Sequence, residues 1–245
     1  MSHDMRPPRV LVVEHEWQTP VGLVGEWLLE AGAELDLRRP HAGEPLPAYL
    51  ADHDAFVVLG GSMDAWDDEG HPWLPDVRVL VHDAVDRAVP TFGICLGHQL
   101  ATLALGGSVA RNPAGDTLAV QPVGWVPGAS ADPLLGAVAG APWGLHWNRD
   151  VVTALPPGAS VLARSPDGAV QAARLAPTVW GVQTHPEVSP EILRAWVREE
   201  GAPYREAGID LDALVTECEE RETELAAGWR PVGATLVELA VGRAR

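Results

Sequence analysis

The first half of the chain alternates between short extended runs rich in apolar residues and longer segments whose apolar residues recur at helical spacing. The extended runs lie at residues 10–13, 35–37, 55–59 and 89–94. Between them, residues 21–30 and 76–88 carry apolar side chains three and four positions apart, as one face of a helix requires. This alternation predicts an α/β fold: a doubly wound, mostly parallel sheet flanked by helices on both faces.

After a predicted helix at residues 97–105, Gly- and Pro-rich turns separate short extended segments. We expect strands of a mixed extension at residues 117–126, 151–154, 161–163 and 169–174, and a further apolar strand at 179–183. From residue 190 onward the helical period returns through Trp196, 211–225 and 236–241. With no repeat and no linker in view, we predict one domain over residues 1–245. Its core covers about 9–188, and a helical C-terminal extension covers about 189–245.

Composition narrows the classes of function. Hydrophobic residues make up 47% of the 245 positions, which is enough to fill a core, and the formal net charge of −17 argues against nucleic acid as a partner. The chain contains no lysine, which excludes a lysine Schiff base and a P-loop. No window approaches the roughly 20 apolar residues of a membrane helix, and no signal peptide is visible. We expect a cytoplasmic protein that does not bind membranes.

Cys95 is the strongest candidate for chemistry. It lies at the centre of Gly93-Ile94-Cys95-Leu96-Gly97, between a predicted strand and a predicted helix, which is the context of a nucleophile elbow. The start of a helix favours thiolate over thiol, and the backbone N–H of Leu96 would face a developing oxyanion. The alternative is a small buried cysteine before a glycine-rich turn.

His185 and Glu187 form a second candidate pair. They flank Pro186 just after the strand predicted at 179–183, and residues two apart in an extended backbone point to the same side. His185 is suited to accept the thiol proton and Glu187 to orient the imidazole. Alone, such a tripeptide is more often a turn leading into a helix.

These segments resemble the signatures of class I glutamine amidotransferases. The resemblance rests on Gly93-Ile94-Cys95-Leu96-Gly97-His98-Gln99, on Thr184-His185-Pro186-Glu187 and on the glycine-rich Leu59-Gly60-Gly61-Ser62-Met63-Asp64. The resemblance spans about residues 10–187. Within the family, the chain most resembles the stand-alone, GMP-synthase-like members. The resemblance implies a Cys95, His185 and Glu187 triad and an oxyanion hole formed by Gly61 and Leu96. It also implies that Gly60 and Gln99 lie at the substrate.

The resemblance also implies the reaction. The Cys95 thiolate would attack the side-chain amide of glutamine, release ammonia and leave a γ-glutamyl thioester that water hydrolyses, with no metal or organic cofactor. Family members normally pass ammonia to a synthetase, so two alternatives follow: either a separate synthetase subunit supplies the acceptor, or the protein is a free-standing hydrolase. The sequence leaves the oligomeric state open. A degenerate regulatory subunit is a further hypothesis.

One segment departs from the family pattern. Leu145-His146-Trp147-Asn148-Arg149-Asp150 lies where these proteins carry a Trp-His-Gly-Asp or Ser-His-Gly-Asp segment that contacts the substrate. His146, Trp147 and Asn148 are therefore candidate substrate-binding residues. Arg149 could contact the carboxylate of a longer substrate or lie at the surface, so a γ-glutamyl peptidase is the second enzyme hypothesis.

Overall fold

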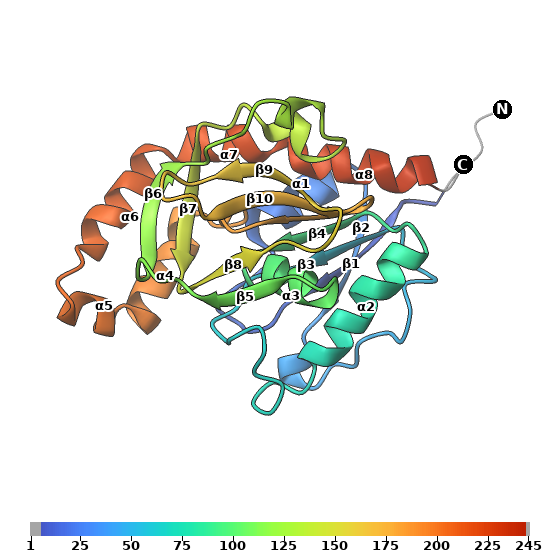
Figure 1. Cartoon of the computed structure of the whole chain (residues 1–245), viewed down its shortest axis with the longest axis horizontal. Coiled ribbons are helices and arrows are strands. Elements are labelled where there is room, and N and C mark those ends of the chain that lie inside the picture. Colours follow the sequence, from blue (N-terminus) through green and yellow to red (C-terminus); the bar gives the residue numbers. More distant parts are fainter. Residues whose placement is uncertain (1–5, 244–245) are drawn as a thin grey trace.

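The computed structural model describes residues 6–243, and Figure 1 shows a central sheet between layers of helices. The sheet has seven strands in the order β2-β1-β3-β4-β11-β10-β9. Their bounds are β1 Arg9–Val13, β2 Glu34–Arg38, β3 Ala55–Val58, β4 Thr91–Ile94, β9 Ser160–Arg164, β10 Val170–Ala176 and β11 Val179–Val182. Strands β2, β1, β3, β4 and β11 run parallel, and β10 and β9 are antiparallel to their neighbours.

Four helices cover the two faces of this sheet: α1 Gly22–Glu30, α2 Leu74–Asp86, α3 Leu96–Ala104 and α8 Pro231–Arg243. Alternate residues of β1 face opposite sides, so Val10 and Val12 pack in one apolar cluster and Leu11 and Val13 in another. Residues of α1 and α8 complete the first cluster, and residues of α2 and α3 complete the second. In Figure 1, α8 and α2 accordingly lie on opposite sides of the sheet. Burial on both faces explains why β1 is continuously apolar.

Two short antiparallel pairs and a group of helices extend one end of the molecule. The pairs join β5 Ser108–Arg111 to β8 Asp150–Ala154 and β6 Thr117–Pro122 to β7 Trp143–Asn148. The helices are α4 Pro190–Glu200, α5 Ala202–Glu206, α6 Leu211–Glu220 and α7 Glu222–Trp229, and short 3-10 turns lie at Pro40–Ala42, Ala129–Ala131 and Leu135–Val138. A third apolar cluster joins α4 and α6 to β6 and β7.

The mostly parallel sheet with flanking helices and a helical C-terminal region confirms the predicted fold class. Strands β5 and β7 were not predicted, because their edge positions carry mixed polar and apolar residues without strict alternation. The predicted continuous helix over 211–225 is wrong in one respect. Arg221, at φ −102° and ψ 4°, divides it into α6 and α7. No helix within residues 6–243 is long and apolar enough to cross a membrane.

Candidate active site

Cys95 lies in a strained turn between β4 and α3. The φ of Cys95 is 48°, and among the described non-glycine residues only Ala88 also has a positive φ. The backbone N–H of Cys95 donates to the carbonyl of Val182 at 2.8 Å, which ties the turn to β11. A β-carbon at Gly97 would lie 2.1 Å from the Val58 carbonyl oxygen, and one at Gly93 would lie 2.6 Å from the Gly97 carbonyl carbon. Glycine on both sides is therefore what permits this close turn of strand and helix, as expected for a nucleophile elbow.

The His185 and Glu187 side chains meet at the end of β11. Nδ1 of His185 lies 2.7 Å from Oε1 of Glu187, and both residues are buried. Burial lowers the pKa of His185, but the Glu187 carboxylate and Cys95 outweigh it and hold that pKa well above its ordinary value. A β-carbon at Gly60 would lie 3.0 Å from Cε1 of His185, so a side chain there would crowd the ring.

Nε2 of His185 has no hydrogen-bond partner among residues 6–243. With Nδ1 engaged by Glu187, this nitrogen is the one left to exchange a proton with the Cys95 thiol. Trp196 packs edge to face against the His185 ring with a centroid separation of 4.9 Å. The imidazole is thus oriented by a carboxylate and held in place by an aromatic ring.

A glutamine that the motifs did not single out also contacts the nucleophile. Nε2 of Gln183 lies 3.3 Å from Sγ of Cys95. Gln99, which was predicted at the substrate, donates to the Asp150 carbonyl at 3.1 Å and lies 3.4 Å from Oε1 of Gln183. Gln183 precedes His185 by two positions, so strand periodicity was the signal that could have placed it beside Cys95.

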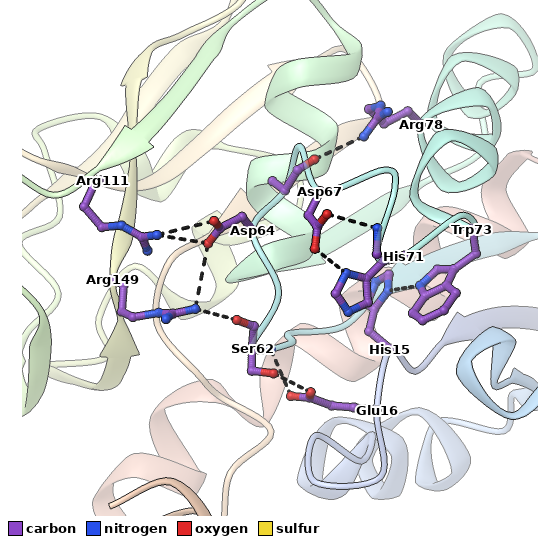
Figure 2. A network of polar contacts seen from close by, with 12 residues as sticks. His15, Glu16, Ser62, Asp64, Asp67, His71, Trp73, Arg78, Arg111 and Arg149 are labelled. Atoms are coloured by element: carbon purple, nitrogen blue, oxygen red, sulfur yellow. Dashed lines mark hydrogen bonds and ion pairs between the residues drawn. The ribbon is translucent and has the colours of Figure 1, made fainter. Parts of the chain in front are cut away.

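The predicted oxyanion donor Gly61 lies in the loop that follows β3, directly before Ser62, whose polar contacts Figure 2 shows. The backbone N–H groups of Gly61 and Leu96 donate to no acceptor within residues 6–243, as an oxyanion hole requires of its donors. Ser62 donates to Glu16 from its backbone N–H at 2.9 Å and from its hydroxyl at 2.6 Å, and its carbonyl accepts from Arg149 at 2.7 Å. Arg149, the departure from the family pattern, therefore holds this loop.

A cavity of about 570 Å³ opens over Cys95. The predicted residues that line it are Gly61, Cys95, Gln99, Trp147, Asn148 and His185. Gly60, Leu96, His146 and Glu187 do not line it; Glu187 lies behind the His185 ring. The lining residues that sequence reasoning missed include Glu16, Asp116, Glu199, Glu200, Trp196 and Tyr204.

His146 is fully buried, and neither of its ring nitrogens has a partner in the described chain. Burial, with a smaller contribution from His185, lowers the pKa of His146 to about 3, so its ring is neutral. The structure thus places His146 in the packing between β7 and the His185 segment rather than at the cavity wall.

Several other titratable side chains do not line the cavity. His98 is buried with its ring over Gly181, and burial raises the pKa of the Cys218 thiol to about 11, with neighbouring glutamates adding to the effect. Asp67 accepts from His71 and Asp68 pairs with Arg78. Among residues 6–243, no three His, Cys, Asp or Glu side chains are grouped to hold a metal ion.

The chain is similar to several known proteins. The family model "Glutamine amidotransferase class-I" matches residues 26–198. The glutamine amidotransferase-like protein YfeJ of Salmonella typhimurium is 30% identical over 78% of this chain and 80% of its own. Gamma-glutamyl peptidase 5 of Arabidopsis thaliana is 31% identical over 67% of this chain and 66% of its own. GMP synthase of Aeropyrum pernix is 29% identical over 91% of this chain, which spans only 42% of that protein.

The fold matches a solved structure over nearly its whole length. A glutamine amidotransferase from Thermotoga maritima superposes with a TM-score of 0.84 at 25% identity, covering 94% of this chain and 98% of that one. The similar proteins and the geometry of the site point to the same family: Cys95 lies on an elbow, and His185 is paired with Glu187. The chain belongs to the class I glutamine amidotransferase family.

Proposed function

We propose that this protein hydrolyses a γ-glutamyl amide, with Cys95 as nucleophile, His185 as general base and acid, and Glu187 orienting His185. One observation carries the proposal. The cysteine on the strained elbow faces the cavity beside a histidine whose other nitrogen is held 2.7 Å from a buried glutamate. Nucleophile, base and orienting group in this order are the requirements of cysteine-dependent acyl transfer.

The chemistry follows from these positions. His185 takes the thiol proton, Sγ of Cys95 bonds to the amide carbon, and the carbonyl oxygen becomes an oxyanion held by the N–H groups of Gly61 and Leu96. The carbon–nitrogen bond then breaks, and the amine leaves with the proton from His185. Water, deprotonated by His185, attacks the thioester, releases glutamate and regenerates the thiol. Gln183 steadies the sulfur through its amide.

Glutamine is the default substrate, because it is the simplest γ-glutamyl amide. The volume of the cavity favours a second candidate, the hydrolysis of larger γ-glutamyl conjugates. About 570 Å³ is within the range of pockets for ligands larger than an amino acid, and gamma-glutamyl peptidase 5 is among the relatives. An ammonia-accepting synthetase subunit remains part of the proposal, supported by the GMP synthase relative, of which this chain spans less than half.

The release of glutamate from γ-glutamyl substrates by the purified protein tests the proposal. Wild-type protein is given glutamine and a panel of γ-glutamyl amides, and Cys95→Ser serves as the isosteric control that removes the thiolate. We expect release that depends on Cys95, together with rapid labelling of Cys95 by a glutamine-like electrophile. Absence of release combined with a thiol no more reactive than free cysteine would instead indicate a regulatory subunit.

A further inference from the structure

The cavity over Cys95 carries a strong excess of negative charge. Five carboxylates line it: Glu16, Asp116, Asp150, Glu199 and Glu200. The one guanidinium in the lining, that of Arg149, is already bound to the Ser62 carbonyl and lies 3.8 Å from Asp64. Asp150 pairs with Arg111 at 2.9 Å and Glu199 with Arg198 at 3.2 Å, whereas Asp116 and Glu200 form no ion pair within the described range 6–243.

The placement of Glu199 and Glu200 is unfavourable without a ligand. They are the last two residues of α4, where the helix dipole presents its negative end. Burial, followed by repulsion from Glu16, raises the pKa of Glu200. Burial and the adjacent Asp116 raise the pKa of Tyr204, on α5, to about 12. A positive charge in this part of the cavity would relieve the repulsion between Glu200 and Glu16.

Aromatic rings stand beside these carboxylates. Trp147 packs edge to face against Trp196 at 5.9 Å and against Tyr204 at 5.5 Å, and all three line the cavity. The faces of tryptophan and tyrosine rings attract ammonium groups within about 6 Å. Carboxylates and aromatic rings together are a combination that recognises organic cations.

A buried polar atom in the same cavity also lacks a partner. Asn148 is 6% exposed and lines the cavity, and its Oδ1 accepts no hydrogen bond from residues 6–243. Its Nδ2 donates to the Asp150 carbonyl at 3.2 Å, which fixes the orientation of the amide. An ammonium group has three donors and no acceptor, so it matches this free oxygen as well as the carboxylates.

The charge of the leaving amine decides which γ-glutamyl amide suits the cavity. The glutamyl part carries one α-ammonium and one α-carboxylate, so it adds no net charge and needs one of the carboxylates at most. A γ-glutamyl peptide adds the carboxylate of its leaving amino acid, which the acidic wall repels. The monoamide of a diamine adds an ammonium, which the same wall attracts.

We propose that the wall formed by Asp116, Glu200 and the Trp147–Tyr204 ring pair binds the cationic end of the leaving amine, so that the preferred substrates are γ-glutamyl amides of diamines or polyamines. This inference rests on the proposed γ-glutamyl hydrolysis and names the substrate class of that site.

Three amides with leaving groups of similar length test it: γ-glutamylputrescine, γ-glutamylpentylamide and γ-glutamyl-γ-aminobutyrate, which end in an ammonium, a methyl and a carboxylate. We expect kcat/KM to fall in that order, by about tenfold or more at each step in low salt, with the differences shrinking as salt is added. Glu200→Gln and Asp116→Asn keep the shape of the side chain and remove its charge. Each should lower the ratio of kcat/KM for the putrescine amide to kcat/KM for the pentylamide. Glu206→Gln, an exposed change on α5 outside the cavity lining, should keep the wild-type ratio.

Calorimetric titration of the same three amides into Cys95→Ala protein separates this inference from the proposed function. The cation site is supported if the putrescine amide binds more tightly than the other two and if the Cys95→Ala/Glu200→Gln double variant weakens that binding. If wild-type protein then hydrolyses none of the amides, the proposed hydrolysis fails while the cation site stands. Hydrolysis of all three amides at equal kcat/KM, with equal affinities, overturns the cation site and leaves the hydrolase intact. A preference for the carboxylate-bearing amide also overturns it.

Discussion

His98 lies three residues after Cys95, fully buried in α3, and neither of its ring nitrogens has a partner within residues 6–243. Burial alone lowers its pKa from the ordinary 6.5 to about 4. The unfolded chain therefore takes up a proton near pH 6.5 that the folded protein refuses until about pH 4. Stability is complete above the unfolded pKa and is lost as the pH falls between these two values.

The size of the stability loss follows from the shift in the pKa of His98. A shift from 6.5 to about 4 corresponds to about 3 kcal/mol in full, of which roughly 2 kcal/mol is lost on acidification to about pH 5. His98→Leu removes this term, and because an unpartnered buried polar group is replaced by an apolar one, little stability should be lost at neutral pH. The variant should therefore lose about 2 kcal/mol less than the wild type between about pH 7.5 and pH 5.

Urea denaturation followed by circular dichroism at the two pH values measures the difference. His15 and His146, whose pKa values burial lowers to about 3, titrate in both proteins and cancel in the comparison. His82→Leu, at an exposed position of α2, controls for replacing a histidine as such. Equal acid losses in wild type and His98→Leu would refute the reasoning.

Three further changes test other parts of the structure. Gly97→Ala places a β-carbon 2.1 Å from a strand carbonyl oxygen and should cost about 1–3 kcal/mol in urea denaturation, whereas Gly242→Ala meets nothing within 4 Å and should not destabilise; similar losses would contradict the elbow packing. Glu187→Gln should lower the pKa of His185 and reduce kcat by roughly a hundredfold or more, and an unaltered pH–rate profile would uncouple the two residues. Arg149→Gln removes a side chain that is 45% exposed, so it should cost less than about 1 kcal/mol of stability. It should nevertheless lower kcat/KM, because Arg149 binds the Ser62 carbonyl and holds the loop that carries Gly61. A stability loss with unchanged kcat/KM would argue against this positioning role.

Local pattern was sufficient for the elements that dominate the core. β1 and β3 are continuously apolar because both their faces are buried, so burial in the fold is already visible in the one-dimensional pattern. The edge strands β5 and β7 escaped prediction because their stability comes from pairing with distant partners, β8 and β6. The division of 211–225 at Arg221 likewise has no Gly or Pro to mark it.

The candidate site divides in the same way. The motifs around Cys95 and His185 were recognisable because an elbow and a strand end impose fixed residue types within a few positions. Gln183 contacts the sulfur through side-chain geometry that no motif of its own announces. His146 resembled a pocket residue in sequence, but it is fully buried and does not line the cavity, whereas its neighbours Trp147 and Asn148 do.

Local spacing along the chain was enough to predict the fold class and the residues proposed for the chemistry: period two or 3.6 for the elements, and a glycine-flanked cysteine for the elbow. The acidic character of the cavity, in contrast, arises only from the folding of the chain. Glu16, Asp116 and Glu200 are far apart along the chain, and no local pattern marks them as neighbours. They face one cavity because the loops after β1 and β5 and the end of α4 converge over Cys95. The electrostatic interaction among them depends on their distance in space and on the medium between them, and not on their separation along the chain.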